Sequence, residues 1–424
     1  MIKIIRAKDV GDRTILSSPK PTDDVADKVT AILEDVRQRG DAALLEYTKR
    51  FDGAALDTLC VSEEEMREAL AQVPTKFLRI LKKAAKNIRA FHLKQVRKGF
   101  EIRKKNGVVL GQKVTPIEKV GLYVPGGTAA YPSTVLMDAI PAKIAGCAKV
   151  LIVTPPNKEG KLNPVILAAA HIAGVDEIYK VGGAQAIGAL AYGTESVPKV
   201  DKIVGPGNAY VAEAKKQVFG KVSIDMIAGP SEILIVAEKG SNPRHLAADL
   251  LSQAEHDKNA SAVLITPDQT LGQAVAQEIE NLLGDMAREE IARASIDNNG
   301  KIILTDTIDE AIAIANEIAP EHLELVVKDP FRYLPLVTNA GSVFLGENCP
   351  EALGDYYAGM NHTLPTCGTA RFSSPLSVDD FVKKTQYAYY TRDALAEVAE
   401  DVAYFALREG LTGHARSATI RTEN

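Results

Sequence analysis

The sequence predicts an α/β protein built from two doubly wound, Rossmann-like parallel sheets. From Val120 onward, short apolar segments rich in Val and Ile alternate with segments of helical character. Continuous apolar strands of this kind are typical of parallel sheets that helices cover on both faces. The expected strands lie at residues 120–124, 150–153, 177–181, 202–204, 233–236, 262–265, 302–304, 323–327 and 342–345.

Both ends of the chain depart from this alternation. The first hundred residues are mainly helical in pattern, and Asn106-Gly107 is a strong hairpin signal. Residues 377–390 and 391–408 have the pattern of two helices without a sheet to cover, followed by an irregular tail. We expect a C-terminal helical arm that packs on another subunit. The expected organisation is an N-terminal segment (1–21), a larger α/β domain (22–119 with 232–376), a second α/β domain (120–231) and the arm (377–424).

The composition is that of an ordinary globular protein. Of 424 residues, 46% are hydrophobic and 25% are charged, and the formal net charge is −5. Because Lys and Arg are scattered, we expect neither nucleic acid nor an anionic membrane as a partner. Residues 1–14 lack an uninterrupted apolar core of signal-peptide length, and no run elsewhere approaches the length of a membrane span. The four cysteines are widely spaced without a Cys-x-x-Cys motif, which favours reduced thiols and a cytoplasmic location.

The segment Leu251 to Asp257 is the first candidate for a functional site. It reads as the end of a helix that begins at Asn242-Pro243. Gln253 and His256 are three residues apart, so they lie on one face of that helix. An imidazole and an amide oxygen placed together are suitable ligands for a divalent metal. A polar helix end with a solvated histidine is the alternative that this segment alone leaves open.

Glycine-rich loops follow several of the expected strands. They are Val124-Pro125-Gly126-Gly127, Val181-Gly182-Gly183-Ala184-Gln185, Val204-Gly205-Pro206-Gly207-Asn208 and Ala228-Gly229-Pro230-Ser231. Loops at the carboxyl ends of parallel strands open onto one crevice, and glycines allow close approach of a ligand to the backbone. None is a Gly-x-Gly-x-x-Gly fingerprint. Together the loops favour a nucleotide or another anionic ligand, and the last one is also a plausible domain crossing.

Three further polar clusters lie later in the chain. They are Pro320-Glu321-His322, the loop from Gly354 to His362 that contains Asp355, and Glu409-Gly410-Leu411-Thr412-Gly413-His414. A histidine next to a glutamate suits proton abstraction near neutral pH. For each cluster taken alone, a solvated or capping role is an equal alternative.

These clusters, in this order, resemble the motifs of the histidinol dehydrogenase family. The resemblance rests on Gln253-x-x-His256, Ala319-Pro320-Glu321-His322-Leu323, Gly354-Asp355-Tyr356 with Asn361-His362, the segment 409–414, and the loops 205–208 and 229–231. It covers residues from about 117 to 414 and shows no departure from the family pattern.

The resemblance implies two successive NAD-dependent oxidations, from L-histidinol through L-histidinal to L-histidine, the last step of histidine biosynthesis. It implies that His322 acts as base and that Glu321 activates water. One Zn²⁺ per site would be bound by Gln253, His256, Asp355 and His414. Substrate contacts are implied for Ser231, Gln253, His256, His322, Asp355, Glu409 and His414, and NAD contacts for Tyr123, Gln185 and Asn208. With the helical arm, the assignment of Glu409 and His414 to the site implies a homodimer with shared active sites.

Other chemistries use the same residues. A zinc hydrolase would need the metal and Glu321 but not the glycine-rich loops. A non-catalytic metabolite-binding protein would need the crevice but not Glu321 beside His322. A thiol is another means of trapping an aldehyde, and Cys147 is the nearest candidate, although a small buried residue is the better reading.

Overall fold

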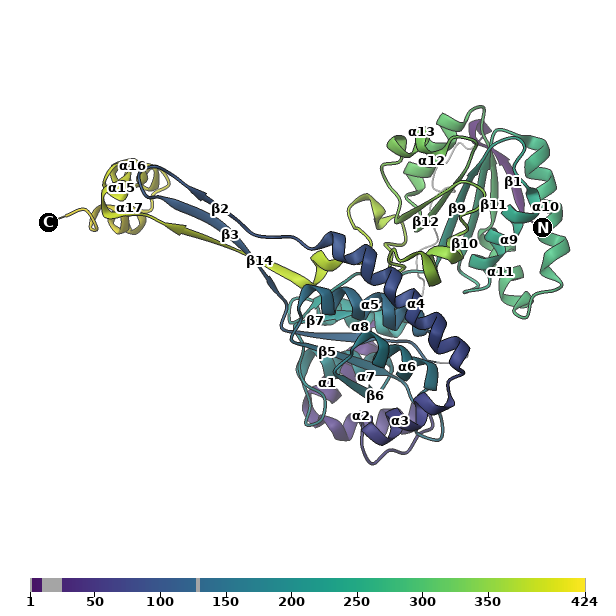
Figure 1. Cartoon of the computed structure of the whole chain (residues 1–424), viewed down its shortest axis with the longest axis horizontal. Helices are drawn as coiled ribbons and strands as arrows, with labels where there is room; N and C mark the ends of the chain where they lie inside the picture. The colour runs from purple at the N-terminus through teal and green to yellow at the C-terminus, as the bar shows by residue number, and fades with distance from the viewer. Residues whose placement is uncertain (1, 10–24, 127–129, 424) are drawn as a thin grey trace. The chain divides into compact units, whose positions relative to one another are not determined.

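The computed structural model describes residues 2–9, 25–126 and 130–423. Within these residues, the strands form a five-stranded, a six-stranded and a three-stranded sheet (Figure 1). The two larger sheets are parallel throughout and helices accompany both, which confirms the predicted fold class. Residues 10–21 of the expected N-terminal segment, residues 22–24 at the start of the expected larger domain, and Gly127 lie outside the described residues.

The five-stranded sheet has the strand order β6-β5-β4-β7-β8. Its strands are β4 (Lys119–Tyr123), β5 (Lys149–Thr154), β6 (Glu177–Lys180), β7 (Lys202–Val204) and the two-residue β8 (Ser223–Ile224). The chain adds β5 and β6 on one side of β4 and then returns to add β7 on the other side. This reversal is the switch point of a Rossmann-like sheet, where a crevice opens at the carboxyl ends of the strands.

Helices from two parts of the chain cover this sheet. They are α1 (Ala26–Arg39), α2 (Asp41–Phe51), α3 (Glu63–Gln72), α4 (Thr75–His92), α5 (Pro132–Ala145), α6 (Pro164–Ala173), α7 (Gly183–Tyr192) and α8 (Ala209–Val218). Val29 and Val36 of α1 share a core with Leu151 and Val153 of β5. We expected residues 22–119 to belong with 232–376, whereas α1 and α2 share their core with the five-stranded sheet and α3 and α4 contact its helices α5 and α6. Their apolar stripes predict that the helices bury one face but do not specify the sheet against which they pack.

The six-stranded sheet has the order β1-β11-β10-β9-β12-β13. Its strands are β1 (Lys3–Arg6), β9 (Glu232–Ala237), β10 (Ser261–Thr266), β11 (Lys301–Leu304), β12 (His322–Val326) and β13 (Ser342–Leu345). Successive residues of β9 enter different cores, as the pleat requires. Ile233 and Ile235 pack with α9 (Pro243–Ala254), α10 (Gln269–Leu283) and α11 (Glu289–Asn299), whereas Leu234 and Val236 pack with α12 (Ile308–Ile318). The edge strand β1 was not expected from the sequence.

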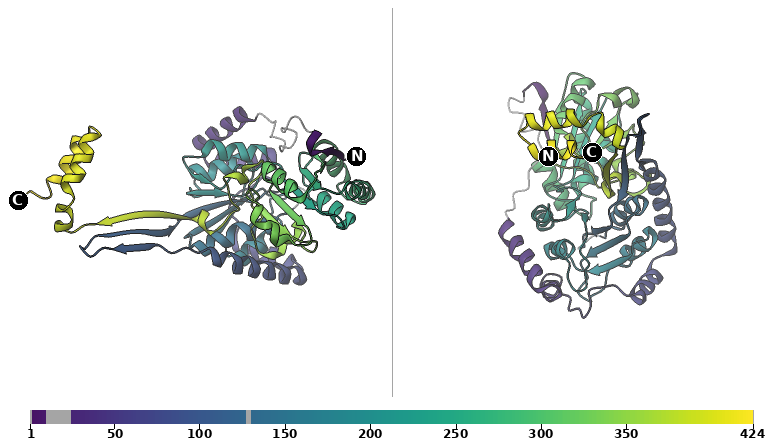
Figure 2. Two further views of the ribbon diagram at one scale, coloured as in Figure 1. Left: turned by 90° about the horizontal axis from the view of Figure 1, so that it is seen from above. Right: turned by 90° about the vertical axis from the view of Figure 1, so that its left-hand side faces the viewer.

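Residues 96–117 and 382–424 form a second compact unit. The predicted hairpin at Asn106-Gly107 is confirmed, since it joins β2 (Phe100–Arg103) to β3 (Val109–Pro116). The prediction of a helix at 377–390 is wrong, because Val382–Tyr389 forms strand β14. This strand lies antiparallel beside β3 (Figure 2). The helices of this unit are α15 (Arg392–Ala396), α16 (Ala399–Arg408) and α17 (Thr412–Thr419), so part of the expected irregular tail is helical.

Candidate active site

Glu321 and His322 lie at the amino end of β12, beside the amino end of the neighbouring strand β9. His322 is the first residue of β12 and is paired in register with Ile233 of β9. Its Nδ1 lies 2.9 Å from the backbone oxygen of Glu232. A carbonyl oxygen only accepts, so Nδ1 donates in this contact and Nε2 is the basic nitrogen of the neutral ring. The Glu321 carboxylate accepts a hydrogen bond of 2.9 Å from the Glu232 N–H.

Carboxylates surround the buried His322 ring. Its Nε2 lies 3.6 Å from Asp355 Oδ1 and 3.9 Å from Glu351 Oε2, while its Nδ1 lies 3.6 Å from Glu321 Oε2. Burial acts to lower the pKa of His322, but Glu321, Asp355 and Glu351 outweigh it and raise the pKa to about 10. Burial raises the pKa of Glu321 to about 8. The site therefore stabilises positive charge.

Gln253 comes to this cluster from the last turn of α9 and is 1% exposed. Its Nε2 lies 3.0 Å from His322 Nδ1 and donates a hydrogen bond of 2.6 Å to Glu351 Oε2. Glu351 begins the short helix α14 (Glu351–Leu353) and was not among the residues expected from the sequence. Its neighbours Cys349-Pro350 and Ala352 form no recognisable motif, so no sequence signal pointed to it.

Asp355 lies in a π-helical turn, Gly354–Ala358, of a kind that is frequent at functional sites. Burial acts to raise the pKa of Asp355, but His322, His362 and His256 together lower it. His256 follows α9 and is exposed, whereas His362 lies with its Nε2 3.3 Å from Thr134 Oγ1. The structure thus brings Gln253 and His256 near Asp355 and the acid–base pair.

The donor set of this cluster fits a divalent metal. Among the described residues, His322, Glu351 and Asp355 offer ligand atoms that all lie within 4.8 Å of one another. His322 Nε2 is buried and makes no hydrogen bond in the described part of the chain. Carboxylate, imidazole and amide oxygen ligands suit Zn²⁺ but are also acceptable to other divalent ions.

The loop that contains Ser231 follows β8 of the five-stranded sheet and leads into this site. It joins β8 of that sheet to β9 of the six-stranded sheet, which agrees with its expected role as a crossing between domains. Ser231 is half-buried and precedes Glu232, the residue that bonds to both Glu321 and His322. A methyl group on Gly229 would lie 2.2 Å from Cys367 Sγ, so this close approach requires glycine.

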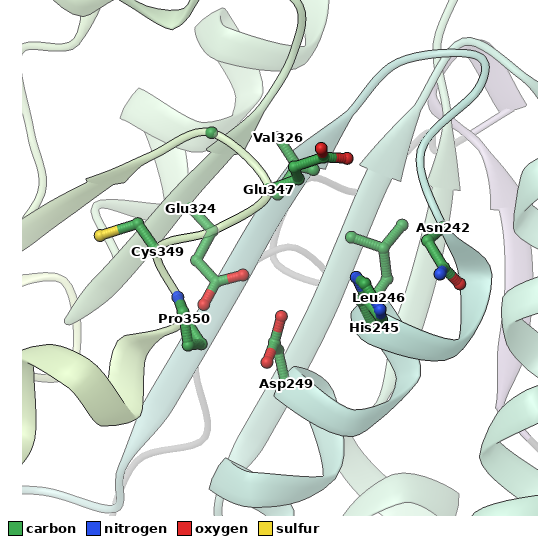
Figure 3. Close-up of a pocket in the computed structure, with 10 residues that line it drawn as sticks. Asn242, His245, Leu246, Asp249, Glu324, Val326, Glu347, Cys349 and Pro350 are labelled. Atoms are coloured by element: carbon green, nitrogen blue, oxygen red, sulfur yellow. The ribbon is translucent and has the colours of Figure 1, made fainter.

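A small acidic pocket is lined by Asp249, Glu324 and Pro350, the residue that precedes Glu351 (Figure 3). Glu324 and Asp249 face each other in it and share a hydrogen bond, and burial raises the pKa of both carboxyl groups. The pair therefore retains a proton well above the pH at which a free carboxyl ionises. Glu324 Oε1 accepts a hydrogen bond of 2.8 Å from the backbone N–H of Glu351, which connects this pocket to the site.

The three residues expected to contact NAD lie at the carboxyl edge of the five-stranded sheet. Tyr123 ends β4, Gln185 lies in the first turn of α7 after β6, and Asn208 caps α8 after β7. The Tyr123 hydroxyl accepts a hydrogen bond of 3.1 Å from the Gly183 N–H. The loops after β4 and β7 flank the switch point of the sheet, where doubly wound proteins bind nucleotides.

Lys215 and Asp225 both hydrogen-bond to the backbone of Gly205 in the loop after β7. Their buried side chains form an ion pair. Lys215 Nζ donates a hydrogen bond of 2.9 Å to the Gly205 oxygen, and Asp225 Oδ2 accepts one of 2.8 Å from the Gly205 N–H. Gly205 has φ +119° and a Cβ there would lie 2.1 Å from the Tyr123 oxygen, so this residue must be glycine.

Neither Cys147 nor Cys367 is an activated thiol. Cys147 is 5% exposed, and burial raises its pKa to about 11. Cys367, which we had not considered, is closer to the acid–base pair, since its N–H donates to Glu232 Oε1. Burial and Glu232 raise its pKa to about 11 as well. Because the thiolate is the nucleophile, neither residue suits covalent trapping of an aldehyde.

Glu409 and His414 belong to the second compact unit. Glu409 ends α16, His414 lies in α17, and both are exposed. Their implied roles in metal and substrate binding stay predictions.

Comparison with known proteins decides the family. A family model described as histidinol dehydrogenase matches residues 17–422. The chain belongs to the histidinol dehydrogenase family. It is 54% identical over 402 residues to the histidinol dehydrogenase of Clostridium acetobutylicum, covering 95% of this chain and 93% of that one. The Geobacillus kaustophilus protein of the same name is 54% identical over 411 residues, with 97% and 96% covered.

A solved structure gives the same result. The crystal structure of histidinol dehydrogenase from Elizabethkingia anophelis is similar with a TM-score of 0.94 at 39% identity, covering 99% of this chain and 98% of that one. The family consists of dehydrogenases, which confirms the prediction that this chain is an enzyme. In the described parts of the chain, no helix combines the length and apolar character needed to cross a membrane.

Proposed function

We propose that this enzyme oxidises L-histidinol to L-histidine in two NAD-dependent steps with L-histidinal as intermediate, the last step of histidine biosynthesis. The observation that carries the proposal is the cluster of the buried Glu321, His322 and Gln253 with the half-buried Asp355 in a chain of this family. It combines a base, a second acid–base group and cation ligands at one place. Four free cysteines in the structure are consistent with a cytoplasmic enzyme.

We propose Gln253, His256, Asp355 and His414 as the ligands of one Zn²⁺ per site. When bound, the ion supplies a positive charge that holds the amino alcohol and offsets the surrounding carboxylates, which lowers the pKa of His322 into the range of a base. Ser231 and Glu409, together with the ligand residues and His322, then complete the contacts to the substrate.

In the first oxidation, His322 Nε2 takes the hydroxyl proton while the carbon transfers a hydride to NAD⁺. The assignment to Nε2 is supported by the Glu232 carbonyl oxygen, which occupies Nδ1. Glu321 then removes a proton from water, the resulting hydroxide adds to the aldehyde carbon, and the protonated His322 returns its proton to the alkoxide to give the hydrate. A second hydride passes from the hydrate to a second NAD⁺, His322 takes the hydroxyl proton, and the product is the acid. Tyr123, Gln185 and Asn208 are the proposed NAD contacts.

We further propose a homodimer in which the arm places His414 and Glu409 in the partner's site. Refolding a mixture of the inactive variants His256→Ala and His414→Ala tests this. In a mixed dimer with shared sites, one site carries both changes and the other carries neither, so activity recovers to roughly a quarter of wild type. Activity that stays at the level of the separate variants contradicts the shared site.

The proposal is tested by following NADH absorbance when NAD⁺ and L-histidinol are added to the purified enzyme. NADH formation that a chelator abolishes, and that Zn²⁺ restores, is expected. Binding of histidinol without NADH formation supports a non-catalytic metabolite-binding protein. Metal-dependent hydrolysis without any NAD requirement supports a zinc hydrolase.

A further inference from the structure

Glu351 is a buried carboxylate that the proposed reaction does not use. It is 2% exposed, and each of its oxygens has a specific partner. Oε1 accepts a hydrogen bond of 2.8 Å from Ser252 Oγ, and Oε2 accepts one of 2.6 Å from Gln253 Nε2. Both partners lie on α9, about one hundred positions earlier in the chain.

The contact with Gln253 determines which end of its amide faces the cation. An amide has one accepting oxygen and one donating nitrogen, and a carboxylate only accepts. The nitrogen must therefore face Glu351, and Oε1 is the polar atom left to bind a metal. Without this acceptor the amide is free to rotate and present its N–H groups to the cation. Residues that orient a ligand from outside the coordination shell commonly affect metal affinity by about 10–100-fold.

Glu351 is itself held on the side away from Gln253. Its backbone N–H donates a hydrogen bond of 2.8 Å to Glu324 Oε1. Glu324 is in turn bonded to Asp249 in the acidic pocket of Figure 3. Ser252 Oγ also lies 2.8 Å from the backbone oxygen of Asp249, which is a second acceptor within reach of its single hydrogen. The carboxylate is thus fixed from two elements before any ligand enters.

We infer that Glu351 is a positioning residue that orients the Gln253 amide so that Oε1 faces the metal, an inference that rests on the proposed function. It acts through its geometry as an acceptor. Its charge is not the feature that matters. Glu351→Gln keeps the length and one accepting oxygen, while its amide nitrogen can donate to Ser252 Oγ. Glu351→Asp keeps the charge but withdraws the carboxylate by one methylene from Gln253.

The test measures the affinity of the full-length protein for Zn²⁺ after metal removal, by competition with a chromogenic chelator. We expect Glu351→Asp to bind Zn²⁺ about 10–100-fold more weakly than wild type and Glu351→Gln to stay within about threefold of wild type. In a Gln253→Ala background, Glu351→Asp should cause no further loss. Glu347→Gln, an exposed carboxylate four positions away, is the matched control and should not change the affinity. Circular dichroism confirms that each variant is folded.

Several outcomes overturn the inference. If Glu351→Asp binds Zn²⁺ as tightly as wild type, the inference is wrong. If Glu351→Gln binds Zn²⁺ more weakly while Glu351→Asp keeps the wild-type affinity, the effect is due to the charge of Glu351. Equal losses of Zn²⁺ affinity in Glu351→Asp and Glu351→Gln would also reject orientation of the amide as the cause. A further loss of affinity when Glu351→Asp is added to Gln253→Ala would reject it as well. If wild-type protein itself has no affinity for Zn²⁺, the proposed metal function fails, and that result is distinguishable from failure of the inference alone.

Discussion

Replacing Lys215 with methionine tests how the loop after β7 is supported. The side chains of Lys215 and Asp225 are 2% and 1% exposed, so water cannot solvate the carboxylate that remains. Breaking a buried pair by removing one partner costs about 3–5 kcal/mol of unfolding free energy, because an uncompensated charge stays behind. Lys215→Met also removes the hydrogen bond to the Gly205 oxygen. We therefore expect a loss near the upper end of that range.

The double variant Lys215→Met with Asp225→Asn separates charge from packing. Asparagine retains an acceptor for the Gly205 N–H but carries no charge, so we expect the loss to fall to about 1–2 kcal/mol. Lys216→Met is the matched control, since Lys216 is exposed and pairs with Glu213 at the surface. Its effect should stay within about 0.5 kcal/mol.

Urea denaturation followed by circular dichroism gives the free energies, and hydrogen exchange of the Gly205 amide reports on the loop itself. We expect faster exchange at Gly205 in Lys215→Met and a higher KM for NAD. A loss below about 1 kcal/mol in Lys215→Met, or a double variant that is no more stable than Lys215→Met, would refute the view that a buried ion pair holds this loop.

Three further predictions concern the site and its surroundings. His322→Asn should slow both oxidations by about 10²–10⁴-fold. Glu321→Gln should slow the oxidation of the aldehyde more than that of the alcohol. Equal effects of Glu321→Gln on the two substrates would contradict the division of roles between Glu321 and His322. Cys147→Ser and Cys367→Ser should each retain substantial activity in the NADH assay, and complete loss in a folded variant would restore the thiol route. Asp138 is buried, and burial together with the charge of Asp225 raises its pKa to about 8. In the unfolded chain the same carboxyl ionises at about pH 4. The folded protein therefore loses stability as the pH rises from about 4 to about 8. The stability of Asp138→Asn relative to wild type should therefore increase by about 1.4 kcal/mol per pH unit between pH 5 and 7 in urea denaturation, and a difference that does not change with pH would contradict this.

Most strands were predictable because their signals are local. The segments at 120–124 and 233–236 are continuous apolar runs, the segment at 323–327 is apolar except for Glu324, and each forms a strand close to its expected bounds. Strand β14 gave no such signal. Almost every one of its residues is exposed, so no apolar face marks it, and its partner β3 lies about 270 positions earlier. β1 is similarly determined by β11, about 300 positions later.

The site was only partly predictable for a related reason. Gln253, His256, Glu321, His322 and Asp355 stand in short motifs that resemble the family, and the structure brings them together. Glu351 has no local motif, and its contacts with Ser252 and Gln253 exist only in the folded chain. The association of α1 and α2 with the five-stranded sheet is likewise decided by the complementary shape of two apolar surfaces, which composition does not encode.

The stoichiometry of NADH formation tests the proposed reaction most directly. A limiting, known amount of L-histidinol is converted to completion with excess NAD⁺ by the metal-loaded enzyme, and the NADH formed is measured by its absorbance while the product is identified by chromatography. Two successive hydride transfers predict about two NADH per histidinol, with L-histidine as the product. One NADH per histidinol with accumulation of the aldehyde, or no NADH at all, would contradict the account.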